Sequence, residues 1–498
     1  MTQASQTSMK DALTITEVKI MEEETGQKKG LSGITYETSG VSIKDQNKVN
    51  AAVVKTLEEL GMNPKGLFGG VVDVSELKGK DSVPIGVLCM TLQEDTSSLD
   101  AGSNTAFSAL QRVKEKMQPL AMLDYYASEE MGQDIVDFVR GVAETGVQQG
   151  VPTIGGESAQ MPGTYKPGRR DAYVVVISHG DKGATVDIAD LIKNMEVPLL
   201  CASTDGTGTK TRIVKDPRDI IYHGLNDLGA IGVKPVAFSL YVAGNSPREE
   251  LDDIVEKSKA ICDTLGITAL ETTVIEKPAE YAEGQVDIAG TVIGVVDKKD
   301  MISGEGVAAG DAIIGIAADG LMTNGYSLAR KYCGTTGDEW DAEGLPGLEG
   351  TTIRKELSKP HVPYTDILFG NDKAEGLLAK FGDKIKATAH ITGGGQHDNI
   401  LRMVPDGLCA CVEKEVLPLP PIVEYFKANN ADMDAMYESF NMGVGFTVTV
   451  SADVQDEVVT YINDNFSESV SGVTRTAAKI GKIVVGDTCG KEKFKYVD

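Results

Sequence analysis

The sequence contains one structural unit twice, and this internal repeat restricts the possible folds more than any other feature. The first copy spans roughly residues 84 to 182 and includes VLCMTLQEDT, QPLAMLDYYAS and DAYVVVISHGDKG. The second spans roughly 197 to 300 and includes LLCASTDGTG, KPVAFSLYVAG and VDIAGTVIGVVDKKD. In both copies short β-branched runs alternate with windows of helical periodicity. The repeat predicts a mixed α/β fold with two strand–helix–strand–helix–strand units.

The two copies differ at the positions that carry acidic side chains. The second copy has a glycine-containing acidic turn and an Asn226-Asp227 pair, whereas the matching places in the first copy lie near Gln93 and at Leu110-Gln111. Conversely, only the first copy has paired glycines directly before an acid, Glu157. Because the losses are complementary, we expect two half-sites to form one site where the copies meet. Sequence drift between two loosely similar units is the alternative.

The sequence pattern changes after the second copy. From Gly310 onward, GDAIIGIAADG, a loop rich in Gly and Asp, and GFTVTV predict one α/β domain that continues to the C-terminus. We therefore divide the chain into a polar tail (1–30), a first N-terminal unit (31–195), a second N-terminal unit (196–300) and a C-terminal domain (301–498).

Acidic side chains outnumber basic ones, with 74 Asp and Glu against 48 Lys and Arg and a formal net charge of −26 in 498 residues. Nucleic acids and anionic membranes are bound through clusters of Lys and Arg, so we expect neither as a partner. The N-terminus has no apolar signal-like segment, and no run of about 18 apolar residues occurs. We therefore expect a cytoplasmic protein.

The seven cysteines are an odd and scattered set, which predicts reduced thiols. Cys409 and Cys411 would share one face of a strand and could form half of a soft-metal site. However, the sequence shows no second Cys/His cluster that would complete it. We therefore interpret the cysteines as buried core thiols.

Asp205 follows an apolar strand end, in a turn with glycines at 206 and 208 and a lysine at 210. Glycines let backbone N–H groups approach an anion, a carboxylate can bind Mg²⁺, and Lys210 could neutralise phosphate oxygens. The turn is not a Walker A loop, because it lacks GxxxxGK[ST]. On pattern alone a plain glycine turn is an equally good interpretation.

Two further acidic segments allow the same pair of interpretations. Gly155-Gly156-Glu157-Ser158 follows the short strand VPTI and suits a nucleotide-phosphate loop with a Mg²⁺ ligand, or a tight strand-exit turn. Asn226-Asp227 lies on a predicted helix one turn after His223. An acid on a helix is more often solvated, and a lone histidine is more often a packing residue. Only the position of Asn226-Asp227 downstream of Asp205 favours a role in binding metal.

Two segments of the C-terminal region also combine polar side chains with glycine. His390-Ile391-Thr392 continues into a triple glycine, Gly393 to Gly395, that enters a helix, which is a suitable geometry for an anion. A simple loop is the alternative. Asn324 opens another helix, where it could bind a ligand or only cap the helix.

Seven ordered motifs together resemble the aminoimidazole ribonucleotide synthetase family, also called phosphoribosylformylglycinamidine cyclo-ligases. The motifs are TYETSGVSI, PLAMLDYYAS, GGESAQMPGTY, STDGTGTK, NGYSLARK, HITGGGQHDNILRMVP and MYESFNMGVG. The resemblance covers most of residues 33–498. It implies a barrel-like pairing of N-terminal ATP-binding α/β units and a C-terminal α/β domain that binds the substrate. It also implies that ATP and Mg²⁺ activate the amide oxygen of formylglycinamidine ribonucleotide, after which the imidazole ring closes and phosphate leaves.

The resemblance also implies roles for individual residues. The metal ligands would be Asp205, Asp227 and Glu157. The catalytic residues would be Asp205, Lys210, which would face the phosphates, and His390. The ATP contacts would be Gly155, Gly156, Glu157, Ser158, Gly206, Thr207, Gly208, Thr209 and Asn226. The substrate contacts would be Asn324, Thr392, Gly393, Gly394 and Gly395. Such chemistry mainly requires positioning and charge neutralisation at the transferred phosphoryl group.

The motif order departs from the family, in which the TDG-type loop precedes the LDYYA and GGE motifs within one domain. We explain the order by a duplicated N-terminal unit whose copies pair inside one chain as a pseudo-dimer, while a homodimer is the other possible assembly. Met322-Thr323-Asn324 also replaces the family's His-Ser-Asn. The alternative functions are a relative of formylglycinamidine ribonucleotide synthetase and a catalytically silent nucleotide-binding protein.

Overall fold

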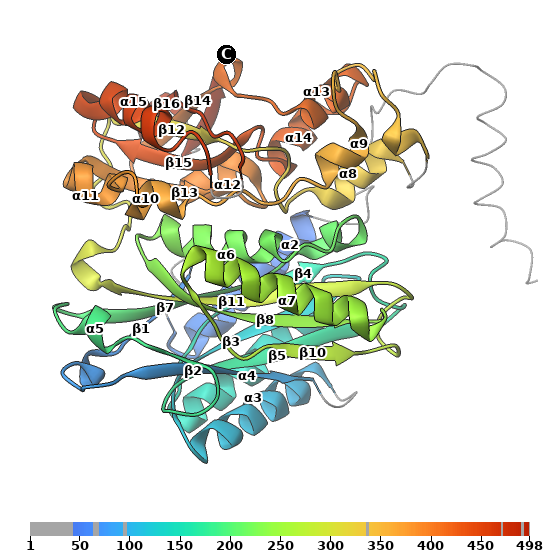
Figure 1. Cartoon of the computed structure of the whole chain (residues 1–498), viewed down its shortest axis with the longest axis vertical. Coiled ribbons are helices and arrows are strands. Elements are labelled where there is room, and N and C mark those ends of the chain that lie inside the picture. Colours follow the sequence, from blue (N-terminus) through green and yellow to red (C-terminus); the bar gives the residue numbers. More distant parts are fainter. Residues whose placement is uncertain are drawn as a thin grey trace, which may run out of the picture.

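The computed structural model consists of two facing sheets in the N-terminal half and a separate α/β layer above them, formed by the C-terminal half (Figure 1). The structure describes residues 43–62, 69–92, 97–334, 338–469, 472–489 and 493–497. The predicted polar tail 1–30, residues 35–42 of the TYETSGVSI motif, and Gln93 lie outside the described residues. The mixed α/β class predicted from the repeat is confirmed.

The first copy forms a sheet with the strand order β4, β3, β5, β2, β6. Its strands are β2 (Pro84–Thr91), β3 (Gln118–Ser128), β4 (Thr153–Gln160), β5 (Arg170–His179) and β6 (Thr185–Asp187). Helices α3 (Ser98–Lys114) and α4 (Gln133–Gln149) cover one face, because apolar residues such as Ala106 and Phe138 pack against Met122 and Val174 of the strands. Helix α2 (Ile43–Glu59) packs beside α4.

The second copy repeats this arrangement with the order β1, β7, β11, β8, β10, and β9 pairs with β8. Its elements are β1 (Gly70–Asp73), β7 (Pro198–Gly206), β8 (Lys234–Gly244), β9 (Thr268–Ala269), β10 (Thr273–Glu276), β11 (Val286–Asp297), α6 (Arg218–Ala230) and α7 (Arg248–Leu265). Strands β3 and β8 correspond residue by residue with an offset of 116 (234 − 118 = 116). Tyr125 therefore matches Tyr241.

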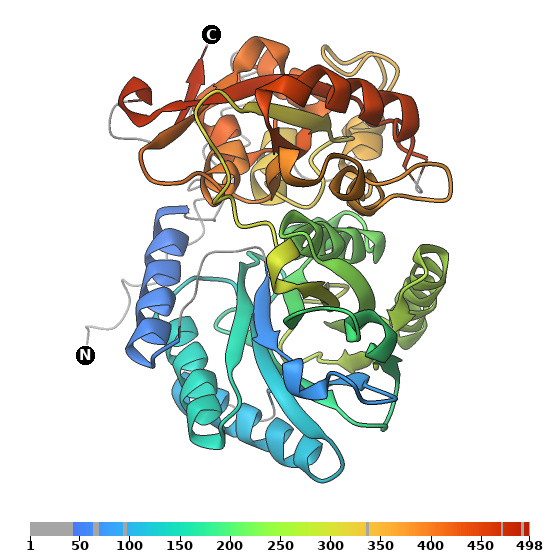
Figure 2. The ribbon, with the colours of Figure 1, turned by 90° about the vertical axis from the view of Figure 1, so that its left-hand side faces the viewer.

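Each sheet is completed by a strand that lies, in the chain, before the other copy. Strand β1 precedes the first copy but pairs with β7 of the second, with Gly70 opposite Ala202. Strand β6 precedes the second copy but pairs with β2 of the first, with Gly86 opposite Thr185. The sheets share one apolar core between them, and the helices of the two copies lie on opposite sides of the pair (Figure 2).

A polar cluster lies inside this core, and its first half is centred on Asp171 of β5. The carboxylate accepts hydrogen bonds from the hydroxyls of Tyr241 at 2.7 Å and Tyr281 at 2.6 Å. It also forms an ion pair with Lys277. A buried carboxylate is tolerated only when it is paired and hydrogen-bonded, and Asp171 is both.

The second half of the cluster is centred on Asp287 of β11, which matches Asp171. Asp287 accepts hydrogen bonds from Tyr125 and Tyr165, both at 3.0 Å. At the position that matches Lys277, however, the first copy has Met161 (277 − 161 = 116). Burial, with the charge of Asp171 nearby, raises the pKa of Asp287 to about 7.

The C-terminal domain contains a sheet with the order β13, β15, β12, β16, β14, β17. Its strands are β12 (Ala312–Ala317), β13 (Ile385–His390), β14 (Leu408–Glu413), β15 (Val444–Val450), β16 (Ala477–Val485) and β17 (Phe494–Val497). Its helices are α8 (Tyr326–Cys333), α9 (Ile353–Leu357), α10 (Thr365–Phe369), α11 (Leu377–Phe381), α12 (Gly395–Leu401), α13 (Pro421–Ala428), α14 (Met433–Ser439) and α15 (Gln455–Asn465). Helix α6 packs against β13, and Thr388 donates a hydrogen bond to the Ala230 carbonyl at 2.6 Å. The domain is therefore held directly over the second copy.

The prediction that all cysteines are reduced core thiols is wrong for one pair. Cys409 and Cys489 form a disulfide across 80 residues of sequence. The turn at Gly486–Cys489 brings Cys489 back over β14. Because only the tertiary fold creates this contact, the pair could not be predicted from the sequence. Among the described helices, none has the length and apolar character needed to cross a bilayer.

Candidate functional site

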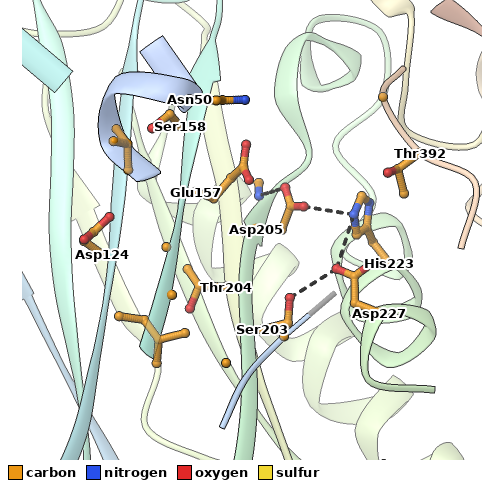
Figure 3. A pocket seen from close by; sticks show the side chains of 18 of the residues that line it. Asn50, Asp124, Glu157, Ser158, Ser203, Thr204, Asp205, His223, Asp227 and Thr392 are labelled. Carbon is orange, nitrogen blue, oxygen red and sulfur yellow. Dashed lines mark hydrogen bonds and ion pairs between the residues drawn. The ribbon is translucent and has the colours of Figure 1, made fainter. Parts of the chain in front are cut away.

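A cavity of about 540 Å³ lies where the two N-terminal copies meet the C-terminal domain. Its walls come from β4 of the first copy, from β7 and α6 of the second, from α2, and from the loops before α8 and α12. The polar residues that line it are Asn50, Asp124, Thr153, Glu157, Ser158, Ser203, Thr204, Asp205, His223, Asp227, Asn324, Thr392, Asp398, Arg402, Glu438 and Ser439. Segments far apart in the sequence therefore converge on one space (Figure 3).

Asp205 is held at the end of β7 by its own turn and by α6. One carboxylate oxygen accepts a hydrogen bond from the backbone N–H of Gly206, and the other contacts Nε2 of His223 at 2.9 Å. A side chain at Gly206 would collide with Tyr125, since a Cβ there would lie 2.4 Å from the phenol oxygen. Glycine is thus required at this turn for close packing against the first copy.

His223 and Asp227 lie one turn apart on α6, so both point toward the cavity. Nε2 of His223 also lies 3.6 Å from Asp227, whose Oδ2 accepts a hydrogen bond from Ser203 at 3.1 Å. Burial opposes a charge on His223, but the carboxylates of Asp205 and Asp227 outweigh it and raise its pKa to about 9. Burial likewise opposes a charge on Asp227, yet His223 and His390 lower its pKa.

The first copy contributes two acids, Glu157 on β4 and Asp124 on β3. Glu157 points toward Asp205 across the space between the copies (Figure 3). Burial, followed by the charge of Asp205, raises the pKa of Glu157 well above its usual range. Asp124 is almost fully buried behind Gly156, and burial alone raises its pKa to about 7. No lysine or arginine of β3 or β4 lines the cavity, so neither strand offsets the charge of these acids.

Buried imidazoles connect the two sides of the site. Nδ1 of His390 contacts Asp227 at 2.8 Å, and its Nε2 lies 2.9 Å from Nε2 of His361. Nδ1 of His361 and Nδ1 of His223 both contact the hydroxyl of Thr323, at 3.2 and 2.9 Å. Burial lowers the pKa of His390, and burial with the neighbouring imidazoles lowers that of His361 well below its usual range. These contacts fix the orientation of the Asp227 carboxylate.

The Thr392 to Gly394 segment closes the cavity from the C-terminal domain. Asn399 holds this loop, because its amide donates hydrogen bonds to the carbonyls of Gly393 at 3.2 Å and Gly395 at 2.7 Å. Gly394 has φ +84°, and a Cβ there would lie 2.3 Å from Asp398, so only glycine fits. Asn324 and Arg402 border the same part of the cavity.

The cavity has more acidic than basic residues. Carboxylates predominate over the cations His223 and Arg402 among its lining residues. A polyphosphate would be repelled by such walls unless divalent cations accompanied it, and carboxylate oxygens are the ligands that Mg²⁺ prefers. Glu157, Asp205 and Asp227 fit that requirement by chemistry. His223, Asp227 and His390 also lie close enough together to share a metal ion.

Comparison with known proteins agrees with this architecture. A family model described as AIR synthase related protein, N-terminal domain, matches residues 116–179 and 180–296, and the corresponding C-terminal domain matches residues 308–488. The phosphoribosylformylglycinamidine cyclo-ligase of Acetivibrio thermocellus is 37% identical over 275 residues, which cover 53% of this chain and 78% of that protein. This chain belongs to the AIR synthase family.

A second cyclo-ligase has a similar sequence identity, and the solved structures are less similar. The cyclo-ligase of Staphylococcus saprophyticus is 33% identical over 317 residues, covering 62% of this chain and 86% of that protein. Among solved structures, E. coli HypE, a hydrogenase maturation protein, has 18% identity and a TM-score of 0.45, covering 64% of this chain and 87% of that chain. Thiamine-monophosphate kinase from Stenotrophomonas maltophilia has 16% identity and a TM-score of 0.41, covering 60% of this chain and 84% of that chain.

Most of the residues that the resemblance to the family implied do line the cavity. These residues are Gly155, Gly156, Glu157, Ser158, Asp205, Gly206, Asp227, Asn324, Thr392, Gly393 and Gly394. His390 lies one contact behind the wall, on Asp227. Gly395 begins α12 and is buried below the loop.

The role implied for Lys210 is corrected by the structure. In its present position the side chain does not face the cavity and cannot contact phosphates there. Its ammonium is completely buried and donates to Asp219 at 2.7 Å and to the carbonyls of Met322 at 2.7 Å and Lys359 at 2.6 Å. An ammonium has three donors, and these three acceptors use all of them. Lys210 therefore joins the N-terminal and C-terminal domains.

Four other implied ATP contacts also lie away from the cavity. Asn226 is fully buried, where its amide donates to the Val362 carbonyl at 2.8 Å and accepts from the Tyr364 N–H at 2.9 Å. One residue along a helix turns the side chain by about 100°, so Asn226 faces the C-terminal domain while Asp227 faces the cavity. The backbone of Thr207 bonds to Ile288, and Thr209 contacts Ser327. Gly208 is the remaining residue of this turn outside the cavity wall.

Sequence reasoning missed several residues of the site. Asp124 had a usable signal, since an acid inside the apolar run LAMLDYYA is rarely buried without a function. His223 was interpreted as a packing residue, although it contacts both acids. Asn50, Asp398, Arg402 and Glu438 carried no local signal, because only the tertiary fold brings them to the cavity.

Proposed function

We propose that this chain catalyses the ATP-dependent ring closure of formylglycinamidine ribonucleotide to aminoimidazole ribonucleotide. The γ-phosphoryl group of ATP is transferred to the amide oxygen of the substrate, which releases ADP. The substrate's own nitrogen then attacks the activated carbon, the imidazole ring forms, and phosphate leaves. The names of the curated relatives and the architecture of the cavity support this reaction.

One observation carries the proposal: a single cavity is lined by both copies and by the C-terminal domain. The first copy supplies Glu157, the second supplies Asp205 and Asp227, and the C-terminal domain supplies the Thr392 to Gly394 loop. In this arrangement a nucleotide lies between acidic strand ends and a substrate lies under the glycine loop. Reactions of this type depend on positioning the two reactants and neutralising phosphate charge.

Mg²⁺ with ATP fits the acidic side of the cavity. Glu157, Asp205 and Asp227 would hold Mg²⁺, which would offset the phosphate charge when bound. The protein's own part is to position these ligands: His223 and His390 orient Asp205 and Asp227, and Ser203 fixes the second oxygen of Asp227. The substrate would lie against Asn324 and the Thr392 to Gly394 loop.

We further propose that the two copies act as an internal pseudo-dimer, so that one chain contains one complete site. Both half-sites belong to the same chain, and the core between the sheets is continuous. On this basis a second copy of the chain is not required for the cavity to form.

The reaction can be tested directly with purified protein. Given formylglycinamidine ribonucleotide, ATP and Mg²⁺, the chain is expected to form aminoimidazole ribonucleotide and ADP in equal amounts. Asp205→Asn should abolish product, while Met90→Leu, on β2 of the first copy and outside the cavity wall, should preserve it. Tight ATP binding without product in the unmodified chain would contradict the proposal and favour a different substrate or a silent nucleotide-binding relative.

A further inference from the structure

Three cysteines converge on the C-terminal sheet, apart from the cavity. Cys409 and Cys411 lie two residues apart on β14, so their side chains project from the same face of the strand. The turn at Gly486–Cys489 places Cys489 over that face. None of the three lines the cavity described above. A site formed by these sulfurs is therefore independent of the proposed reaction.

The disulfide leaves one sulfur of the cluster unused, and that sulfur lies at a distance typical of a metal site. Cys489 is bonded to Cys409, but the Cys411 sulfur also lies 3.7 Å from the Cys489 sulfur. All three sulfurs lie within 4.8 Å of one another. With Zn–S bonds of about 2.3 Å, two sulfurs of a tetrahedral site are separated by about 3.8 Å. A disulfide uses only two of the sulfurs and gives no role to the third.

The surroundings of the cluster offset the charge of three thiolates. In the sheet, Cys411 is paired with Lys482 of β16 and with Lys495 of β17, so both lysine side chains project from the same face as Cys411. Both lysines are exposed. Three thiolates with one divalent cation carry a single negative charge, and two nearby ammonium groups favour that charge. Cys489 is partly exposed, which provides a path by which a metal ion can enter.

We propose that the reduced chain binds one soft divalent cation, such as Zn²⁺, through Cys409, Cys411 and Cys489. A dithiol reductant supplies two electrons and two protons to the Cys409–Cys489 disulfide and is itself oxidised to a cyclic disulfide. Metal binding then displaces the three thiol protons. Three protein ligands leave a fourth position for water or another small ligand. The metal would join β14 to the turn after β16 and hold the edge of the sheet.

Cd²⁺ and Co²⁺ are suitable probes, because their thiolate complexes absorb light. Protein reduced with dithiothreitol and freed of reductant is expected to bind about one Cd²⁺ per chain through thiolates, measured by the thiolate-to-Cd²⁺ absorption, which the histidine and carboxylate ligands of the cavity do not produce. Co²⁺ should give thiolate charge-transfer bands and the intense visible bands of a tetrahedral site. Cys411→Ser should lose these bands and bind Cd²⁺ at least about tenfold more weakly, on the scale by which lost metal contacts lower affinity. Cys89→Ser, on the N-terminal sheet, is the matched control and should bind as the unmodified chain does.

A second measurement covers the case in which Cys411→Ser does not fold. The reduced, unmodified chain is treated with a thiol-alkylating reagent with and without Cd²⁺, and the modified cysteines are identified by mass spectrometry. Cd²⁺ should protect Cys409, Cys411 and Cys489 and leave the reactivity of Cys89 unchanged. A reduced chain that binds no Cd²⁺, or protection of only two of the three cysteines, would overturn the proposal and identify the pair as a plain disulfide.

Discussion

The two copies of the repeat share a backbone but differ in every acid that faces the cavity. Met90 pairs with Val174 in the first copy as Asp205 pairs with Gly290 in the second, so Met90 and Asp205 occupy matching positions. Strand pairing likewise matches Glu157, which lies beside Tyr125, with Thr273, which lies beside Tyr241. The first copy therefore keeps the β4 acid and the second keeps the β7 acid.

This difference shows how a duplicated unit can form one site instead of two. The paired copies create two junctions, one where β4 meets β7 and its counterpart where Cys89 of β2 contacts Thr273 of β10. Only the first junction retains acids on both sides and is covered by the C-terminal domain. At the second junction, Met90 packs among the apolar residues of α3 and α4. The complementary acids of the two copies therefore line a single cavity.

The largest expected effect in this comparison comes from replacing one residue at each junction, at matching positions. Glu157→Gln should lower kcat/KM on the order of 10²–10³-fold, because the side chain loses the carboxylate that would hold Mg²⁺ with ATP. Thr273→Val, at the matching position, should change it less than about twofold, as expected away from a site. Steady-state kinetics of both variants measure the difference. Equal losses in both variants would show that each junction has a catalytic role.

The buried aspartates of the core should differ in the same way. Asp171→Asn leaves the Lys277 ammonium buried without its partner, which should lower the free energy of unfolding by about 3–5 kcal/mol. Asp287→Asn removes an acid that has no cation beside it, and should cost less than half as much. Urea unfolding of both variants at pH 7 gives the comparison. A similar cost for both would mean that Lys277 contributes little to the stability of this cluster.

The same pair predicts a pH dependence of stability. The pKa of Asp287 is about 7 in the folded chain, above its ordinary value of 3.8, so the folded state binds the extra proton between these pH values. The stability that this proton provides is present at pH 4 and is lost as the pH rises to about 7. The total loss from this group is at most about 4 kcal/mol.

Two variants test this dependence. One removes the Asp287 carboxyl, and the other lowers its pKa. Asp287→Asn should flatten the change in unfolding free energy between pH 4 and 7. Met161→Lys would place a cation where Lys277 stands in the other half, lower the pKa of Asp287 and flatten the same slope. An unchanged slope in the Asn variant would assign the pH dependence to other groups.

The smallest expected effect on the free energy of unfolding is that of a substitution on α3. Phe107 occupies the position that matches His223 (223 − 107 = 116), and its side chain is 48% exposed. Phe107→Ser should alter the unfolding free energy by no more than about 0.5 kcal/mol. Thermal unfolding and sedimentation of the variant provide the measurement. A larger loss that depends on protein concentration would mean that a second chain covers this helix.

The fold class and the principal acids could be predicted from the sequence, because they depend on local patterns. Alternating β-branched strands and amphipathic helices are visible in each copy, and Asp205 and Glu157 directly follow or end apolar strands. The match of Asp205 to a position near Gln93 was inaccurate, since strand register, visible only in the paired sheets, assigns Met90 instead.

Other parts of the site depend on contacts that no local pattern records. Lys210 resembled a phosphate ligand because of its glycine-rich turn, but its acceptors come from Asp219 and from two carbonyls more than 100 residues away. His361 joins the site only because the segment before α10 passes beside β13. Long-range hydrogen bonds of this kind give a residue a different role from the one that its short motif suggests.

The exchange of β1 and β6 between the copies has a consequence for protein engineering. A fragment that begins at residue 196 would lack β1, and a fragment that ends before residue 185 would lack β6, so each would expose an unpaired strand edge. Two complementary fragments divided between residues 184 and 185, expressed separately, should aggregate alone and recover activity only when they are mixed, because β1 and β6 then lie on opposite fragments. The repeat is therefore a poor place to divide the gene, although it is the clearest boundary in the sequence.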